Sequence, residues 1–135
     1  LRRQRQMCIR DRRKISLIIG IGNDLIEKSR VKKACEKDAF LSYVFTEHER
    51  ELILKKPDRA AGNWAVKEAV AKAMGTGFLG FKIREIEVLR DELGKPYVNL
   101  YGSAKLKQEE LGIKAFFVSI SDTKEYVSAV AVAEG

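Results

Sequence analysis

Two carboxylates and one ammonium have the types and spacing to do chemistry: Glu68, Lys72 and Asp24. Glu68 and Lys72 are four residues apart in an Ala-rich stretch, so a helix there would place them on one face. Spacing alone favours a surface ion pair between these two side chains. The second interpretation is a metal-binding or acid/base carboxylate with a cation beside it, because small neighbouring residues let a bulky ligand approach the helix.

Asp24 follows the apolar run of residues 17–22, which is bounded by glycines and predicts a buried strand. An Asp at a strand end can cap the next helix, which is its commoner role, or bind a metal. It can meet Glu68 if this strand packs beside the helix that carries Glu68. Two carboxylates, together with water and substrate phosphates, are a usual way of holding Mg2+ in proteins.

The helix that carries the Glu/Lys pair is predicted over residues 58–74. Ala has the lowest cost of any residue in a helix, and Asp58 stands where an N-cap residue belongs. Gly75 stands where a left-handed C-cap residue belongs. With Thr76 and Gly77 it opens a loop whose backbone N–H groups could lie near phosphate, although such a loop alone is weak evidence.

The rest of the chain alternates short helical and strand patterns. Helices are predicted at residues 27–37, 46–55 and 102–112, and strands at residues 83–88, 97–100, 116–121 and 126–133. The first two of these strands flank a turn at residues 91–96 and predict a hairpin. In the last helix, Leu106 and Leu111 are expected to face the core. The prediction is one α+β domain over residues 15–135, with an antiparallel sheet packed against the long Ala-rich helix.

The net charge of +7 comes almost entirely from the first residues of the chain. Residues 1–14 contain seven Lys or Arg and one Asp, which leaves 19 positive and 18 negative charges in residues 15–135. That near-neutral remainder argues against a nucleic-acid-binding domain. Residues 6–12 resemble the translation of a transposon adapter used in DNA sequencing, so residues 1–14 are expected to be a non-native, irregular tail. The alternative is a genuine basic arm that binds phosphate or nucleic acid.

Composition also narrows the expected cellular setting. No apolar run approaches the roughly 18 residues that a membrane span needs, and the N-terminus lacks the apolar core of a secretory signal. Cys35 is the one cysteine outside the tail, so a reducing, cytoplasmic setting is expected. His48 is the only histidine. With one histidine and one cysteine, neither a Cys/His dyad nor a zinc site is expected.

Two motifs together resemble those of a known family. They are Gly20-Ile-Gly22-x-Asp24-x-x-Glu27-x-x-Arg30 and Lys67-Glu68-Ala-x-x-Lys72-Ala-x-Gly75-Thr-Gly77. In this order they resemble the holo-[acyl carrier protein] synthases, which are small, single-domain 4'-phosphopantetheinyl transferases, and the resemblance spans about residues 17–134. It implies Mg2+-dependent transfer of the phosphopantetheine arm of coenzyme A to a serine of apo acyl carrier protein, with release of 3',5'-ADP. The usual setting in the family is fatty-acid biosynthesis.

The resemblance also implies roles for individual residues. Asp24 and Glu68 would bind Mg2+, and Lys72 would neutralise charge on the pyrophosphate or the departing nucleotide. Glu68, directly or through a metal-bound water, would be the base for the serine hydroxyl, and Arg30, in a locally basic helix, would contact the acidic carrier. The further candidates for binding coenzyme A are Lys67, Gly75, Thr76, Gly77, Ser121 and Lys124. Small members of the family are trimers with active sites between subunits, so a homotrimer is expected.

Two positions depart from the family pattern. Many members have His after Ser-x-Ser, where this chain has Asp122, and many have Arg where this chain has Asn63. Both positions lie near the nucleotide end of coenzyme A in the family, and Lys124, Lys95 or Lys67 could supply the missing positive charge. The departures leave one alternative open, which is a non-catalytic carrier-binding module of the same fold.

Overall fold

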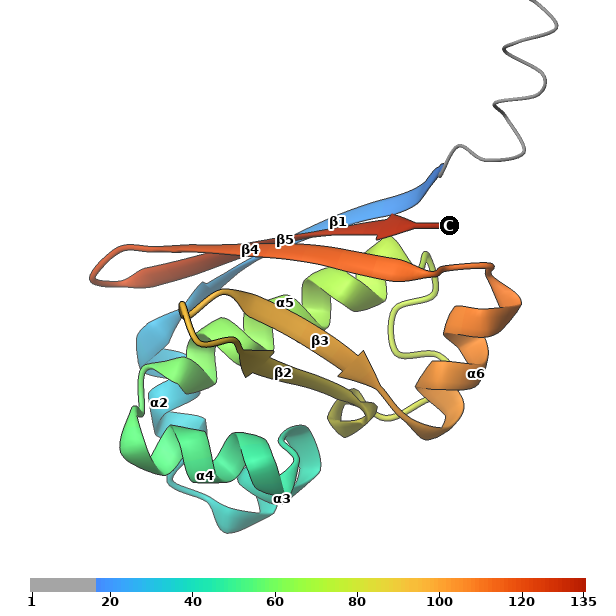
Figure 1. Ribbon diagram of the computed structural model, residues 1–135. Coiled ribbons are helices and arrows are strands. Elements are labelled where there is room, and N and C mark those ends of the chain that lie inside the picture. The colour runs from blue at the N-terminus through green and yellow to red at the C-terminus, as the bar shows by residue number, and fades with distance from the viewer. Residues whose placement is uncertain (1–16) are drawn as a thin grey trace, which may run out of the picture.

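The computed structural model describes residues 17–135 (Figure 1). The tail predicted at residues 1–14 lies outside this range. None of the helices in the described range is long and apolar enough to cross a membrane. The elements are, in chain order, β1 (Ile18–Glu27), α2 (Lys28–Ala34), α3 (Asp38–Val44), α4 (Glu47–Lys55), α5 (Arg59–Ala73), η1 (Ile83–Glu85), β2 (Ile86–Arg90), β3 (Pro96–Leu100), α6 (Gly102–Glu110), β4 (Ala115–Asp122) and β5 (Tyr126–Glu134).

The Ala-rich helix α5 is the centre of the fold. It lies against the inner face of the three-stranded sheet β1-β5-β4, and the β2–β3 hairpin covers another side (Figure 1). Most of its residues are buried because of this double cover. Gly75 follows the helix with a φ of 78°, so the predicted left-handed C-cap is confirmed. Asp58 occupies the N-cap position, but its side chain makes no capping hydrogen bond.

Strand β1 runs three residues beyond Asp24 and pairs along its length with β5, where Asp24 lies opposite Ala129. Asp24 therefore lies inside a strand and caps no helix. The prediction of a buried strand is wrong for one of its two faces, since Ile21 is 68% exposed and Leu25 is 67% exposed. Side chains alternate between the faces of a strand, so these two residues belong to the outer face, away from α5.

The inner face of β1 approaches α5 closely because it carries glycine. A Cβ atom built at Gly22 would overlap the carbonyl oxygen of Ala69, and one at Gly20 would overlap that of Ala73. The obstacles are backbone atoms of the helix, which cannot move aside as a flexible side chain can. Glycine at both positions is thus a steric requirement of this helix–strand contact.

The remaining elements confirm some predictions and correct others. The predicted hairpin is confirmed as β2 and β3, with the Asp91 carboxylate accepting hydrogen bonds from backbone N–H groups of the turn. The helix predicted at residues 27–37 is wrong in extent, because α2 ends at Ala34 and a separate helix, α3, begins at Asp38. In α6, Leu106 was expected to face the core and is instead 63% exposed. Ala104 and other residues of that helix turn inward in its place.

The contact between β1 and α5 gives a stability prediction. Gly22→Ala should destabilise the protein by about 3 kcal/mol, at the upper end of the usual range for overpacking, because the new methyl group meets backbone. The melting temperature measured by circular dichroism should fall accordingly. Gly62→Ala is the matched control, since a Cβ there has its nearest neighbour at 3.5 Å and Ala is favoured inside a helix. Equal effects of the two substitutions would contradict the steric role of Gly22.

Candidate functional site

Lys72 pairs with Asp24 across the contact between α5 and β1. Its Nζ donates to Asp24 Oδ1 at 3.1 Å and to the backbone oxygen of Asn23 at 2.9 Å. Within residues 17–135, no ion pair joins Lys72 to Glu68, so the interpretation of these two as a surface pair along the helix is not supported. The fold instead gives Lys72 a partner that is distant in sequence.

Glu68 lies on the same edge of α5 and carries a perturbed carboxyl group. Burial raises the pKa of Glu68 above its ordinary value, and the negative charge of Asp24 raises it further, while the charge of Lys72 lowers it. The three side chains therefore form one electrostatic cluster, named here the Asp24 cluster. Perturbed titratable groups of this kind are typical of functional sites, although structural networks also produce them.

The Asp24 cluster has the chemistry of a two-carboxylate magnesium site. Mg2+ is commonly bound by one or two carboxylates together with water and substrate phosphates. Asp24 is close enough to Glu68 for its negative charge to raise the pKa of Glu68. Such repulsion is expected between two carboxylates that share a site. No group of three or more His, Cys, Asp or Glu side chains with metal-binding geometry occurs in residues 17–135, so an ion held by Asp24 and Glu68 would need its other ligands from water and substrate.

The glycine loop after α5 was expected to offer backbone N–H groups to phosphate. Two of these donors are already used, because Gly75 N–H donates to Lys72 O at 2.9 Å and Gly77 N–H donates to Ala71 O at 3.2 Å. The hydroxyl of Thr76 donates to the Gly77 carbonyl at 3.2 Å. The loop therefore completes the end of α5, and it borders the Asp24 cluster through Lys72.

Lys67 is a correction to the predicted coenzyme site. It is fully buried, and its ammonium donates to Glu49 Oε1 at 2.7 Å and to the carbonyl of Ile86. Burial lowers the pKa of Lys67 and raises that of Glu49, and the opposite charge of each partner acts against these shifts. Because its side chain is fully enclosed in the core, Lys67 has no exposed surface left for a ligand in this chain.

Ser121 and Lys124 lie at the end of the β4–β5 hairpin, where both are exposed. Lys124 lines an open groove of about 910 Å³ together with other cationic residues, including Lys28 and Arg59. Asp122, one of the two positions expected to depart from the family pattern, forms an ion pair of 2.9 Å with Lys28. The negative charge at this departure is therefore offset within the chain.

A second basic hollow, of about 440 Å³, opens between β4, the β2–β3 hairpin and the start of α5. Its cationic residues are Lys28, Arg59, Arg90 and Lys95. Sequence reasoning missed Arg90, because an Arg before a turn gives no signal by itself. This hollow lies on the β4 side of the sheet, whereas the Asp24 cluster lies on β1 at the opposite edge.

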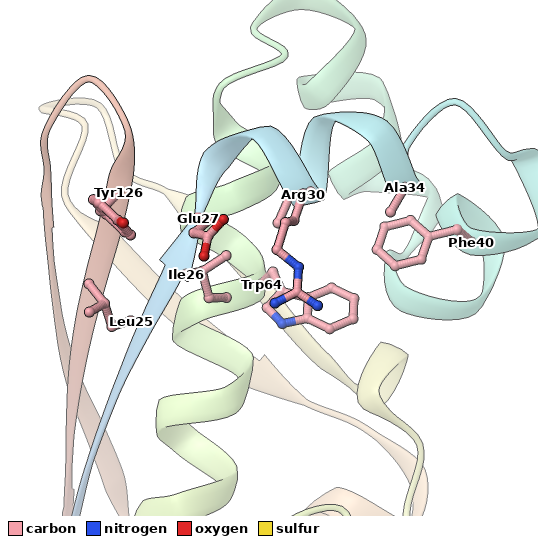
Figure 2. Close-up of a pocket in the computed structure, with 9 residues that line it drawn as sticks. Leu25, Ile26, Glu27, Arg30, Ala34, Phe40, Trp64 and Tyr126 are labelled. Carbon is pink, nitrogen blue, oxygen red and sulfur yellow. The ribbon is translucent and has the colours of Figure 1, made fainter.

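Arg30 lines a third hollow, of about 430 Å³, together with apolar and aromatic side chains (Figure 2). Figure 2 shows Arg30 from α2 beside Trp64 from α5, with Tyr126 and Leu25 on the sheet side. The rings of Phe40 and Trp64 stack with centroids 5.1 Å apart. An exposed arginine beside an aromatic floor is a combination that occurs often at protein interfaces.

Comparison with known proteins defines the class to which this fold and site belong. The family pattern of the 4'-phosphopantetheinyl transferase superfamily matches residues 20–131. The match covers β1, which carries Asp24, and α5, which carries Glu68 and Lys72. The matched range therefore includes all three residues of the Asp24 cluster.

Individual relatives narrow the class. A holo-[acyl-carrier-protein] synthase of Lachnoclostridium phytofermentans is 53% identical over 118 residues, which cover 87% of this chain and 97% of that protein. The crystal structure of the synthase from Neisseria meningitidis has a TM-score of 0.80 at 34% identity and covers 88% of this chain and 100% of that one. The synthase from Bacillus anthracis, in complex with CoA (3',5'-ADP), has a TM-score of 0.72 at 33% identity, with 87% and 97% coverage. The chain belongs to the holo-[acyl-carrier-protein] synthase family of 4'-phosphopantetheinyl transferases, and it is an enzyme of that class.

The charges around Glu68 give a pH prediction. Asp24→Asn should lower the pKa of Glu68, because a repelling negative charge is removed, whereas Lys72→Met should raise it. The Glu68 carboxyl carbon, followed by NMR as pH is varied, reports both shifts. Asp58→Asn, the same change at the other end of α5, is the control and should leave this titration unchanged. If neither substitution changed the pKa of Glu68, the three side chains would not act as an electrostatic cluster.

Proposed function

We propose that this chain transfers the 4'-phosphopantetheine arm of coenzyme A to a serine of apo acyl carrier protein and releases 3',5'-ADP. The observation that carries the proposal is the Asp24 cluster, which combines two carboxylates and an ammonium at the contact between β1 and α5. The names of the relatives support the same reaction, since they are holo-[acyl-carrier-protein] synthases and one was crystallised with CoA (3',5'-ADP).

Mg2+ is the metal that the Asp24 cluster suits, with Asp24 and Glu68 as its protein ligands. A bound Mg2+ would supply charge neutralisation at a pyrophosphate. Lys72 adds a positive charge on the same edge of α5, where it can stabilise negative charge on the leaving nucleotide. Glu68 is the group suited to accept the proton of the carrier serine, because its raised pKa brings it closer to the pH at which proton transfer is efficient.

In bond terms, the serine oxygen forms a bond to the β-phosphorus of coenzyme A. The bond from that phosphorus to the bridging oxygen of the pyrophosphate breaks, and the electron pair leaves with 3',5'-ADP. The serine proton passes to Glu68. Such a displacement requires positioning and charge neutralisation more than covalent chemistry from the protein, which agrees with a site built from charged side chains.

The carrier is proposed to dock on the hollow beside Arg30. Acyl carrier proteins are small and acidic, and α2 places Arg30 at this hollow and carries Lys28, Lys32 and Lys33 on the same helix. Complementary charge steers the encounter, and the apolar floor around Trp64 offers area for contact. The acidic carrier is thus matched in charge by α2 and in hydrophobicity by the floor of the hollow.

We also propose that the working form is a homotrimer in the cytoplasm, serving fatty-acid biosynthesis. The outer face of the three-stranded sheet exposes apolar side chains of β1, and a large apolar face usually marks an interface. The Asp24 cluster is carried by β1 and α5, whereas the basic hollow borders β4 and the β2–β3 hairpin, so a substrate bound between neighbouring copies could meet both regions. The free thiol of Cys35 agrees with a reducing compartment. Sedimentation equilibrium tests the assembly, and a monomer would contradict it.

The transfer reaction gives the test of the function. Glu68→Gln and Asp24→Asn should each nearly abolish transfer and weaken Mg2+ binding, because each removes one charged ligand without creating a cavity. Lys72→Ala should slow transfer while Mg2+ still binds, since its charge acts on the phosphates. Mass spectrometry of an apo carrier incubated with coenzyme A and Mg2+ reports transfer, and calorimetry reports the metal. Normal, magnesium-dependent turnover by the Glu68→Gln protein would sink the assignment, and no transfer by the unmodified chain would favour a non-catalytic carrier-binding module.

Carrier docking gives a separate prediction. Arg30→Glu should weaken binding of the carrier, more at low salt than at high salt, while binding of coenzyme A is retained. Ionic strength separates the interpretations, because a surface charge loses its influence as salt screens it. Lys105→Glu on α6 reverses an exposed charge far from this hollow and should have little effect. Equal losses for carrier and coenzyme would mean that Arg30 is structural.

A further inference from the structure

Asn63 is a buried amide whose orientation is determined by its neighbours. It is 1% exposed, and its Nδ2 donates to Glu49 Oε2 at 2.9 Å and to the carbonyl oxygen of Val88 at 3.1 Å. Both N–H bonds of the amide are thereby used, and both partners are acceptors only. The amide oxygen must therefore point away from them, and it accepts a hydrogen bond from Arg90 Nη1 at 2.9 Å.

This hydrogen bond ends a chain of buried polar contacts that begins at Lys67. The ammonium of Lys67 holds one oxygen of Glu49, and Asn63 holds the other. Four side chains from α4, α5 and β2 are thus connected in a row, and the last of them is the guanidinium of Arg90. Satisfied buried networks of this kind are rigid, so the direction of the last member is well defined.

Arg90, the last member of this row, borders the basic hollow between β4 and α5. Arg90 and Arg59 both line it. Burial lowers the pKa of Arg90 to about 10, and the nearby positive charge of Arg59 contributes to the same shift. A Cβ built at Gly62 would lie 3.5 Å from Arg90 Nη2, an ordinary contact distance, so the guanidinium lies beside the first turns of α5. Two guanidinium groups thus converge on one cavity.

The cation pair of Arg59 and Arg90 lacks a carboxylate partner. Within the described part of the chain, no ion pair involves either residue. Two carboxylates line the hollow, Asp58 and Asp122, and the second is engaged by Lys28 at 2.9 Å. Four cationic residues against two acidic ones leave the hollow positive. A guanidinium pair without a carboxylate is suited to a phosphate, which it can meet with parallel N–H bonds.

We propose that Asn63 is a positioning residue that holds Arg90 in the basic hollow, where Arg90 and Arg59 together bind the 3'-phosphate of coenzyme A. This inference rests on the proposed function. Coenzyme A has one phosphate outside its pyrophosphate, a monoester at the 3' position, and a dianion is the natural partner of two guanidiniums. The departure at position 63 is thereby accounted for. Asn63 stands where many family members have Arg, and its amide holds Arg90 in the hollow instead. Lys67, buried against Glu49, is excluded from this role.

The test compares coenzyme A with dephospho-coenzyme A, which lacks only the 3'-phosphate. Arg90→Gln should weaken binding of coenzyme A by about tenfold or more, the value of a charge-assisted hydrogen bond, and leave dephospho-coenzyme A binding unchanged. Arg84→Gln is the matched control, because this exposed arginine is not among the residues that line the hollow and should change neither affinity. Calorimetry measures the affinity of the unmodified protein and of each variant for both ligands.

Asn63→Ala tests the positioning role. It should reduce the preference for coenzyme A over dephospho-coenzyme A, and Arg90→Gln should add little further loss in the double variant, because the two residues act in series. If Asn63 had a purely structural role, Asn63→Ala would weaken binding of both ligands equally. The preference for coenzyme A would then be unchanged, which would overturn the proposal. Equal binding of the two ligands by the unmodified protein, or an unchanged preference in Arg90→Gln, would also overturn it. In those cases transfer to the carrier would still occur, so the proposed function would remain supported although this proposal had failed.

Discussion

The structure depends above all on the close contact between α5 and β1. Gly20 and Gly22 bring the strand against the backbone of the helix, with no room for even one methyl group. This short separation lets the ammonium of Lys72 reach the Asp24 carboxylate at 3.1 Å. It also places Asp24 within electrostatic reach of Glu68. The chemistry of the site follows from the steric fit, because a wider spacing would leave three separate surface charges.

A second constraint acts on the other side of α5, where the buried Lys67–Glu49 pair joins this helix to α4. A buried ion pair is weak evidence for net stability, because desolvation of the charges opposes their attraction. Its clearer consequence here is geometric. The pair uses one oxygen of Glu49 and leaves the other for Asn63, and that amide determines the direction of Arg90. The buried contacts of Glu49 and Asn63 thus hold the guanidinium of Arg90 in place.

The two charged regions are separated by the sheet that supports them. The Asp24 cluster lies on β1, whereas the basic hollow borders β4, and β5 runs between these strands. In the proposed trimer, the exposed apolar residues of the outer face, such as Ile21 and Leu25, would supply contact area between copies.

Local patterns determined much of this protein from sequence alone. The Ala-rich helix, its glycine end, the hairpin and the motif residues Asp24, Glu68 and Lys72 follow from periodicity, turn chemistry and family motifs, which are properties of neighbouring residues. The partner of Lys72, the burial of Lys67 and the direction of Arg90 were decided only by the tertiary structure. Each depends on which distant segment lies opposite a side chain. The sequence alone does not distinguish a motif lysine that faces a ligand from one that faces a buried glutamate. For Lys67, the packing of α4 against α5 decides between these two environments.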